Sequence, residues 1–192
     1  LGQSIVSSND CYQIVASQGS IISLMGGKIS QTLHEVVTAL TYINRFTGSM
    51  GAYTVAQHSC LVSDMLSGSY NALMHDGHES IVGDVSTPVK NALDLAGGNI
   101  WRDFEHGIAK SFRSYWGVAN PMPTQVKSAD QLAFQVEVAS LASNEAKASY
   151  MRMGISPLYG TRWTIKDVWE PDRAYVEFMK RFETLGPAGR TK

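Results

Sequence analysis

Four side chains in this sequence have the chemistry needed to bind a divalent metal ion. They are His58, the adjacent pair His75-Asp76, and Asp130. Two imidazoles with two carboxylates suit Mn, Co, Fe, Ni or Zn, and such a ligand set leaves positions open for water and phosphate oxygens. Because no thiolate accompanies them, a closed structural zinc site is disfavoured. The four residues predict a divalent-metal centre, with Mg at a second site as an open option.

Each of these residues also has an ordinary structural role open to it. His58 could cap a helix, His75 could be a hydrogen-bonded core histidine, and Asp130 could be a charge favoured by a helix dipole. The His75-Asp76 pair is the more informative feature, because neighbours on a helix point about 100° apart and rarely serve one core face. Whether the four residues form a metal site or have separate structural roles must therefore be judged from the residues around them.

Three further charged residues fit hydrolytic chemistry at such a centre. Glu79 lies one predicted helical turn beyond His75, where a carboxyl group can transfer a proton to or from water or a leaving group. Arg45 and Lys90 are candidate phosphate ligands, the first as a planar fork and the second as a point charge. All three could instead be solvated surface charges.

The spacing of apolar residues predicts the helices that position these groups. Helices are expected over residues 32–46, 54–66, 70–79, 91–95, 101–115, 124–150 and 172–185. The first two begin with capping-box signatures, Thr32 with Glu35 and Thr54 with Gln57. The second and third carry three of the predicted ligands, and the helix over 124–150 carries Asp130 near its start.

The predicted fold is mainly α, a single-domain helical bundle with a small N-terminal β element. Residues 1–29 form a β-hairpin-like extension, residues 30–150 the helical core, and residues 151–192 a C-terminal loop and helix that pack on the same domain. The length of 192 residues suffices for one substantial hydrophobic core.

Composition narrows the classes of partner. The formal net charge of −1 provides no broad basic field for a nucleic-acid polymer, while small anions stay open as ligands. The two cysteines, Cys11 and Cys60, are too few for a disulfide framework and are expected to be buried thiols in a reducing compartment. With neither a signal-like segment nor a membrane-spanning one in the sequence, we expect a cytoplasmic protein that does not bind membranes.

The segments around the predicted ligands resemble a known family. They are Asn44-Arg45-Phe46-Thr47-Gly48, Tyr53–Ser59, His75-Asp76-Gly77-His78-Glu79, Gly83–Lys90 and Val126–Asp130. Together they resemble the HD superfamily of phosphohydrolases, and closely the YfbR-type 5′-deoxynucleotidases and related bacterial and phage HD hydrolases. The likeness covers roughly residues 18–145, and the His-Asp pair followed by Glu, Gly-Asp and Thr-Pro-x-Lys is its specific part.

The resemblance implies a helical HD-domain fold in which His58, His75, Asp76 and Asp130 hold a metal that promotes phosphoester hydrolysis. It places an acidic residue at Asp84 that assists catalysis or orients a ligand. Phe46 stands where YfbR-type enzymes carry a Trp that packs near the sugar, so sugar selectivity does not carry over directly.

Three more residues take their roles from these matched segments. Thr87, in the Thr-Pro-x-Lys segment, is a candidate substrate contact. Tyr53 could stack on a base or pack in the core. Glu137 lies seven residues after Asp130, where related phage hydrolases also keep Glu, and a structural ion pair is its expected role.

The resulting hypothesis is a metal-dependent hydrolase of deoxynucleotides, a small-molecule substrate. It removes phosphate from 5′-monophosphates or triphosphate from a dNTP such as dATP, and the sequence does not separate the two. The alternative is a non-catalytic nucleotide-binding or regulatory HD module. The C-terminal aromatic residues could form a homo-oligomer interface or cover the protein's own core; they are Trp163, Trp169, Tyr175 and Phe178.

Overall fold

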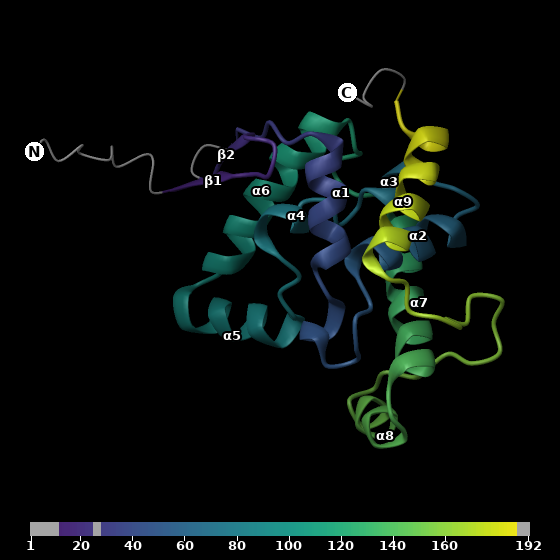
Figure 1. The fold of residues 1–192 in the computed structure, drawn as a ribbon. Helices are drawn as coiled ribbons and strands as arrows, with labels where there is room; N and C mark the ends of the chain where they lie inside the picture. The colour runs from purple at the N-terminus through teal and green to yellow at the C-terminus, as the bar shows by residue number, and fades with distance from the viewer. Residues whose placement is uncertain (1–11, 25–27, 188–192) are drawn as a thin grey trace, which may run out of the picture.

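The structure, a computed structural model, describes residues 12–24 and 28–187 and is mainly α in that part of the chain (Figure 1). In order, its helical elements are α1 (Leu33–Tyr42), the short turn η2 (Arg45–Gly48), α2 (Val55–Met65), α3 (Tyr70–Leu73), α4 (Glu79–Val82), α5 (Thr87–Gly97), α6 (Ile100–Trp116), α7 (Thr124–Leu141), α8 (Asn144–Arg152) and α9 (Pro171–Leu185). The predicted fold class, mainly α with a small β element, is confirmed.

A two-stranded antiparallel sheet precedes the helices. Strand β1 (Gln13–Val15) pairs with β2 (Ile21–Ser23), and Ile22 of β2 is buried in the hydrophobic core. The hairpin predicted within residues 11–29 is therefore present where the structure describes the chain. Cys11, with the stretch 25–27, lies outside the described residues.

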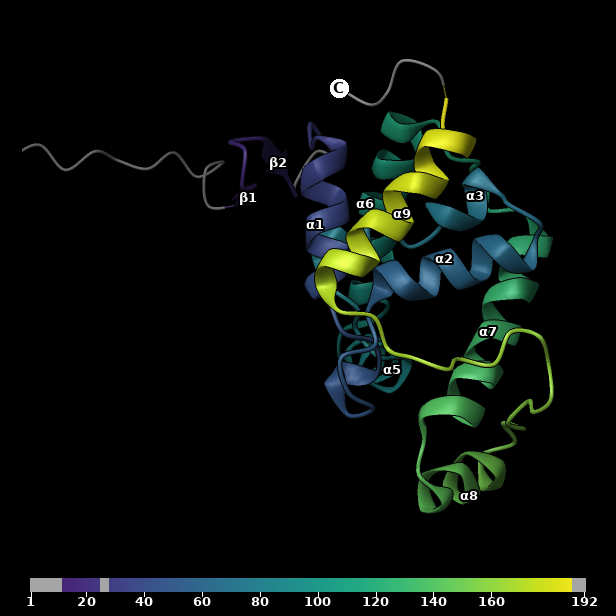
Figure 2. The same cartoon turned by 45° about the vertical axis from the view of Figure 1, so that its right-hand side comes forward.

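The C-terminal helix α9 shares its hydrophobic core with α1 and α2. Phe178 and Phe182 of α9 are buried in one apolar cluster with Leu40 of α1 and Val62 of α2. Figure 2 shows α9 crossing in front of the ends of α1 and α2. Of the predicted C-terminal aromatics, Phe178 is part of this core, and Trp169 and Tyr175 pack against it, so these three cover the protein's own interior.

The two predicted capping residues both cap their helices. Thr32 and Glu35 make the reciprocal capping box at the start of α1. Thr54 accepts from the Gln57 N–H at the start of α2, but the Gln57 side chain turns to the C-terminal segment. Its amide donates to the Asp167 carbonyl at 2.8 Å and accepts from the Trp169 N–H at 2.9 Å, which joins the start of α2 to the chain leading into α9.

The helix predicted over residues 70–79 is wrong. Helix α3 ends at Leu73, and His75 and Asp76 lie in the turn that leads into α4. Gly77 allows this turn to approach α6 closely, because a Cβ at Gly77 would lie 2.5 Å from the buried ring of Phe112. The adjacent ligands are therefore presented by a tight turn and not by a helical face.

Two other predicted helices run too long. The one expected to end near residue 46 stops at Tyr42, where Ile43 becomes extended and Asn44 forms an isolated β-bridge with Thr54. The one expected over residues 124–150 divides into α7 and α8, because Ala142 is extended and the Ser143 side chain caps α8 by accepting from the Ala146 N–H.

Among the helices in residues 12–24 and 28–187, none combines the length and apolar character that crossing a bilayer requires.

Glu35 makes part of the protein's stability depend on pH. Burial opposes its ionisation, but hydrogen bonds from Ser20, Thr32 and Gln18 outweigh burial and lower the pKa of Glu35 from 4.5 to about 2. A depressed folded-state pKa stabilises the protein above the unfolded value, and this stability is lost as the pH falls from about 4.5 to about 2. We expect Glu35→Gln to lower the free energy of unfolding at pH 7 by about 2 kcal/mol.

Urea unfolding at pH 7 and pH 3 measures this effect. The difference in stability between the two pH values should shrink in Glu35→Gln, while Glu183→Gln on the exposed face of α9 should behave as wild type. An unchanged difference in Glu35→Gln would contradict the assignment.

The close approach at Gly77 gives a second stability prediction. Gly77→Ala places a methyl group against the Phe112 ring and should lower the free energy of unfolding by about 1–3 kcal/mol. Gly107 in α6 is a matched control, because a Cβ there meets no atom within 4 Å. Gly107→Ala should raise stability by about 0.5–1 kcal/mol. Thermal unfolding would refute the packing argument if both variants moved in the same direction.

Candidate metal centre

The four predicted metal ligands come together at one point. His58 is on α2, His75 and Asp76 are in the turn between α3 and α4, and Asp130 is on α7. One ligand atom from each lies within 4.8 Å of all the others. The Nε2 atom of His58 is 3.1 Å from Asp130 Oδ1, and that of His75 is 3.0 Å from Asp76 Oδ2. The four residues predicted as ligands are thus assembled into a single cluster.

This cluster fits a divalent ion. Metal–ligand distances of about 2.0–2.2 Å place neighbouring ligand atoms about 3.0–3.4 Å apart. The other two imidazole–carboxylate distances are somewhat longer, 3.6 Å from His58 Nε2 to Asp76 Oδ2 and 3.8 Å from His75 Nε2 to Asp130 Oδ1. Both Nε2 atoms are buried without a hydrogen-bond partner, which is costly unless a ligand satisfies them. The donor set and its geometry can hold a metal ion.

The second nitrogen of each histidine is already occupied. The Nδ1 of His58 lies 2.5 Å from Glu137 Oε1, and the Nδ1 of His75 lies 2.7 Å from the Ala72 carbonyl oxygen. Both partners are acceptors, so each Nδ1 carries the proton and donates it. In the neutral imidazole, each Nε2 therefore has its lone pair directed at the cluster, which is the arrangement of metal-binding histidines.

Glu137 joins this cluster to Arg45. Its Oε2 accepts from Arg45 Nε at 3.2 Å and Nη2 at 3.1 Å, while its Oε1 accepts from His58. Glu137 is fully buried; burial raises its pKa, but Arg45 and His58 outweigh burial and lower it. The predicted ion pair is confirmed, and the same carboxylate also orients a metal ligand.

The electrostatics of the cluster favour a cation. Burial lowers the pKa of His75, but Asp76 and Asp130 outweigh it and raise that pKa to about 9. Burial and Arg45 lower the pKa of His58, whereas Glu137, Asp130 and Asp76 raise it well above its usual value. A divalent ion would supply the positive charge that protons otherwise bring to the two imidazoles.

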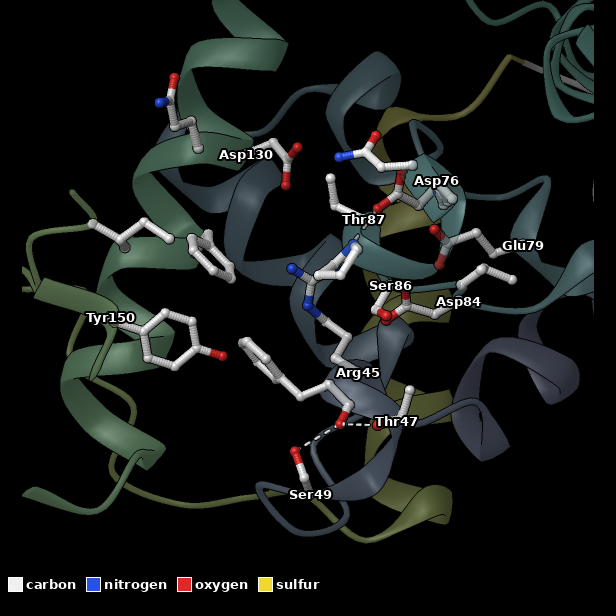
Figure 3. A pocket seen from close by; sticks show the side chains of 18 of the residues that line it. Arg45, Thr47, Ser49, Asp76, Glu79, Asp84, Ser86, Thr87, Asp130 and Tyr150 are labelled. Carbon is white, nitrogen blue, oxygen red and sulfur yellow. Dashed lines mark hydrogen bonds and ion pairs between the residues drawn. The ribbon is translucent and has the colours of Figure 1, made fainter. Parts of the chain in front are cut away.

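A pocket of about 910 Å³ opens beside the cluster, and Asp76 and Asp130 line it (Figure 3). Its walls come from η2, the segment 84–91 at the start of α5, α7, and the segment 150–155. The volume lies within the usual range of small-molecule sites, about 300–1,000 Å³. Metal cluster and pocket therefore form one site.

Both predicted catalytic acids line this pocket. Glu79, at the first position of α4, is buried, and burial with the nearby charges of Asp76 and Asp84 raises its pKa well above 4.5. Burial also raises the pKa of Asp84 above 3.8, against the opposing effect of Arg45. Carboxyl groups that keep a proton at higher pH than usual are suited to proton transfer.

Both predicted phosphate ligands line the pocket, and each already has a carboxylate partner. Arg45 is held by Glu137, which leaves its Nη1 directed toward Asp76 at 4.0 Å from Oδ2. Lys90 Nζ lies 2.6 Å from Glu105 Oε1. Their charges are thus fixed in place but largely neutralised within the protein.

Of the remaining predicted substrate contacts, two line the pocket and one does not. Phe46 and Thr87 line the pocket. Tyr53 does not, because its side chain is completely buried beside Glu137, where burial raises its pKa. A base cannot stack on Tyr53 in this conformation, so its assignment as a substrate contact is corrected to core packing.

Several pocket residues were given no role by the sequence analysis, among them Asn91, Gln131, Phe134 and Tyr150. Phe134 carried a usable signal, since it follows Asp130 by four residues and so shares its helical face. Tyr150 carried none, because the chain bends between α7 and α8 before reaching it.

Comparisons with known proteins give relatives but no activity. No protein-family model matches the chain. It is similar to the uncharacterized protein YfdR of Escherichia coli, with 29% identity over 156 residues that cover 80% of this chain and 83% of the relative. It is also similar to an uncharacterized protein of Rhodobacter capsulatus, with 26% identity over 133 residues, 60% of this chain and 66% of that relative.

The role of Glu137 can be tested through metal affinity. Glu137→Gln keeps the size of the side chain but removes the charge that orients and polarises His58. We expect the affinity for Mn²⁺ or Zn²⁺ to fall about 10–100-fold. Competition with a chromophoric chelator measures it, with Glu105→Gln as the control because Glu105 contacts Lys90 and not a ligand. Equal metal affinity in wild type and Glu137→Gln would refute the role.

Proposed function

We propose that this protein is a metal-dependent phosphohydrolase of the HD type and that its substrates are deoxynucleotides. The observation that supports this most directly is the position of Glu79, a buried carboxyl group with a raised pKa, in the same pocket as the four-residue metal cluster. A metal cluster alone would fit many functions, whereas its combination with a proton-transfer group and two cations in one pocket fits phosphoester hydrolysis.

The bound divalent ion, held by His58, His75, Asp76 and Asp130, would lower the pKa of a bound water and neutralise phosphate charge. Mn, Co, Fe, Ni or Zn suits these mixed nitrogen and oxygen ligands better than Mg, which prefers oxygen ligands alone.

The other pocket residues take roles that follow from their positions. Glu79 exchanges a proton with the attacking water or the leaving oxygen, because burial and the neighbouring carboxylates of Asp76 and Asp84 raise its pKa and favour its protonated form. Arg45, fixed through Nε and Nη2, offers Nη1 to a phosphate oxygen without losing further side-chain freedom. Asp84, which lies on the same side of the pocket as Glu79, orients the substrate or water.

The charge distribution favours one phosphate group over three. Arg45 and Lys90 are the cations that line the described pocket, and each is already paired with a glutamate. Four acidic residues line the same pocket: Asp76, Glu79, Asp84 and Asp130. A triphosphate would find few unneutralised positive charges there, so we propose a 5′-monophosphate as the preferred substrate and a dNTP as the weaker alternative.

The proposal is tested by incubating metal-loaded protein with dNMPs and dNTPs and measuring released phosphate and triphosphate. Wild type should release phosphate from at least one dNMP. Glu79→Gln should lower kcat about 10²–10⁴-fold, because proton transfer is lost while the metal ligands remain. Metal content should be unchanged in this variant, and Glu183→Gln serves as the activity control.

The outcomes separate the enzyme from a non-catalytic module. Nucleotide binding without turnover in wild type would support a nucleotide-binding or regulatory module and reject the enzyme. The double variant His75→Ala with Asp76→Ala should lose both metal and activity while keeping its helical circular dichroism.

A further inference from the structure

The pocket has an aromatic wall, formed by Phe46, Phe134 and Tyr150. The rings of Phe46 and Phe134 stack with centroids 5.7 Å apart and an interplanar angle of 25°. Tyr150 meets Phe134 edge-on, with centroids 5.9 Å apart and an angle of 83°. Each ring packs against another, so the wall keeps its shape without a ligand.

The aromatic wall lies away from Glu79 and Asp84. Figure 3 shows Tyr150 on one side and Glu79 and Asp84 on the other, with Arg45 between them. The Tyr150 hydroxyl points toward the interior of the pocket in this view. A molecule with a phosphate at the metal cluster would therefore extend past Arg45 toward the aromatic wall.

Polar groups line the same pocket as the rings. The amides of Asn91 and Gln131 line the same pocket, and each amide can donate and accept hydrogen bonds. A purely hydrocarbon group would displace water from this part of the pocket without replacing the hydrogen bonds of these polar groups. A flat ring with nitrogen and oxygen atoms on its edge satisfies both the rings and the amides.

We propose that the aromatic wall binds the base of the nucleotide and that α8 contributes to this base site through Tyr150. This inference rests on the proposed function, since it names the part of the substrate that the pocket recognises. It assigns a role to α8 and to the Phe134 side chain of α7, neither of which the metal chemistry uses.

Binding of a nucleoside tests the inference independently of hydrolysis, because a nucleoside has no phosphoester to cleave. Isothermal titration compares deoxyadenosine and thymidine with 2-deoxyribose, using the full chain loaded with Mn²⁺. We expect at least one nucleoside to bind about 10-fold or more tightly than the sugar. Tyr150→Ala and Phe134→Ala should each weaken nucleoside binding about 10-fold, and Tyr150→Phe should retain most of it.

Met151→Ala is the matched control, because Met151 neighbours Tyr150 on α8 but is exposed and does not line the pocket. Circular dichroism and Mn²⁺ affinity should be unchanged in every variant, which separates loss of the wall from loss of the fold. Nucleosides that bind no better than 2-deoxyribose, or equal binding in wild type, Tyr150→Ala and Phe134→Ala, would overturn the inference.

The two proposals fail in different ways. Nucleoside binding that depends on the aromatic wall, without hydrolysis of any nucleotide, would support the base site and reject the enzyme. Hydrolysis that proceeds equally well on deoxyribose 5-phosphate and on dAMP would support the enzyme and overturn the base site.

Discussion

The site depends on a single buried carboxylate. Glu137 lies in the interior with no exposed surface, and an unpaired charge there would be strongly destabilising. Arg45 and His58 neutralise it from two sides, and the three side chains come from η2, α2 and α7. Removing one partner of such a buried group typically costs about 3–5 kcal/mol, so the three elements are held in register by charge as well as by packing.

This arrangement explains why so many polar groups remain buried near the cluster. His58 gives one nitrogen to Glu137 and directs the other at the predicted metal position, while Arg45 gives two of its nitrogens to the same glutamate. Helix α2, which carries His58, also packs in the apolar core with α1 and α9. The Gln57 amide joins the C-terminal segment to the start of α2. The proposed chemistry therefore sits on a scaffold that joins α1, α2, α7 and α9.

Sequence patterns predicted the parts that depend on local chemistry. The caps at Thr32 and Thr54 follow from residue type and spacing, whereas the four members of the metal cluster were predicted from residue type together with the resemblance to the HD superfamily; the structure contains all of them. The breaks at Met74 and Ala142 were missed because apolar periodicity continues through both positions. Burial of Tyr53 and the position of Tyr150 depend on how distant elements pack, which no spacing along the chain records.

One face of α7 brings together three separate tasks. Asp130, Phe134 and Glu137 follow one another at intervals of four and three residues, so they lie along the same side of the helix. With a rise of about 1.5 Å per residue, about 6 Å along the helix axis separates the metal ligand from the ring of the aromatic wall. Helix α7 thus fixes the distance between the metal cluster, where a phosphate would bind, and the aromatic wall, where a ring would bind. Lengthening or shortening α7 by one residue between these positions would rotate the two ends apart, which makes the helical repeat itself a determinant of what fits.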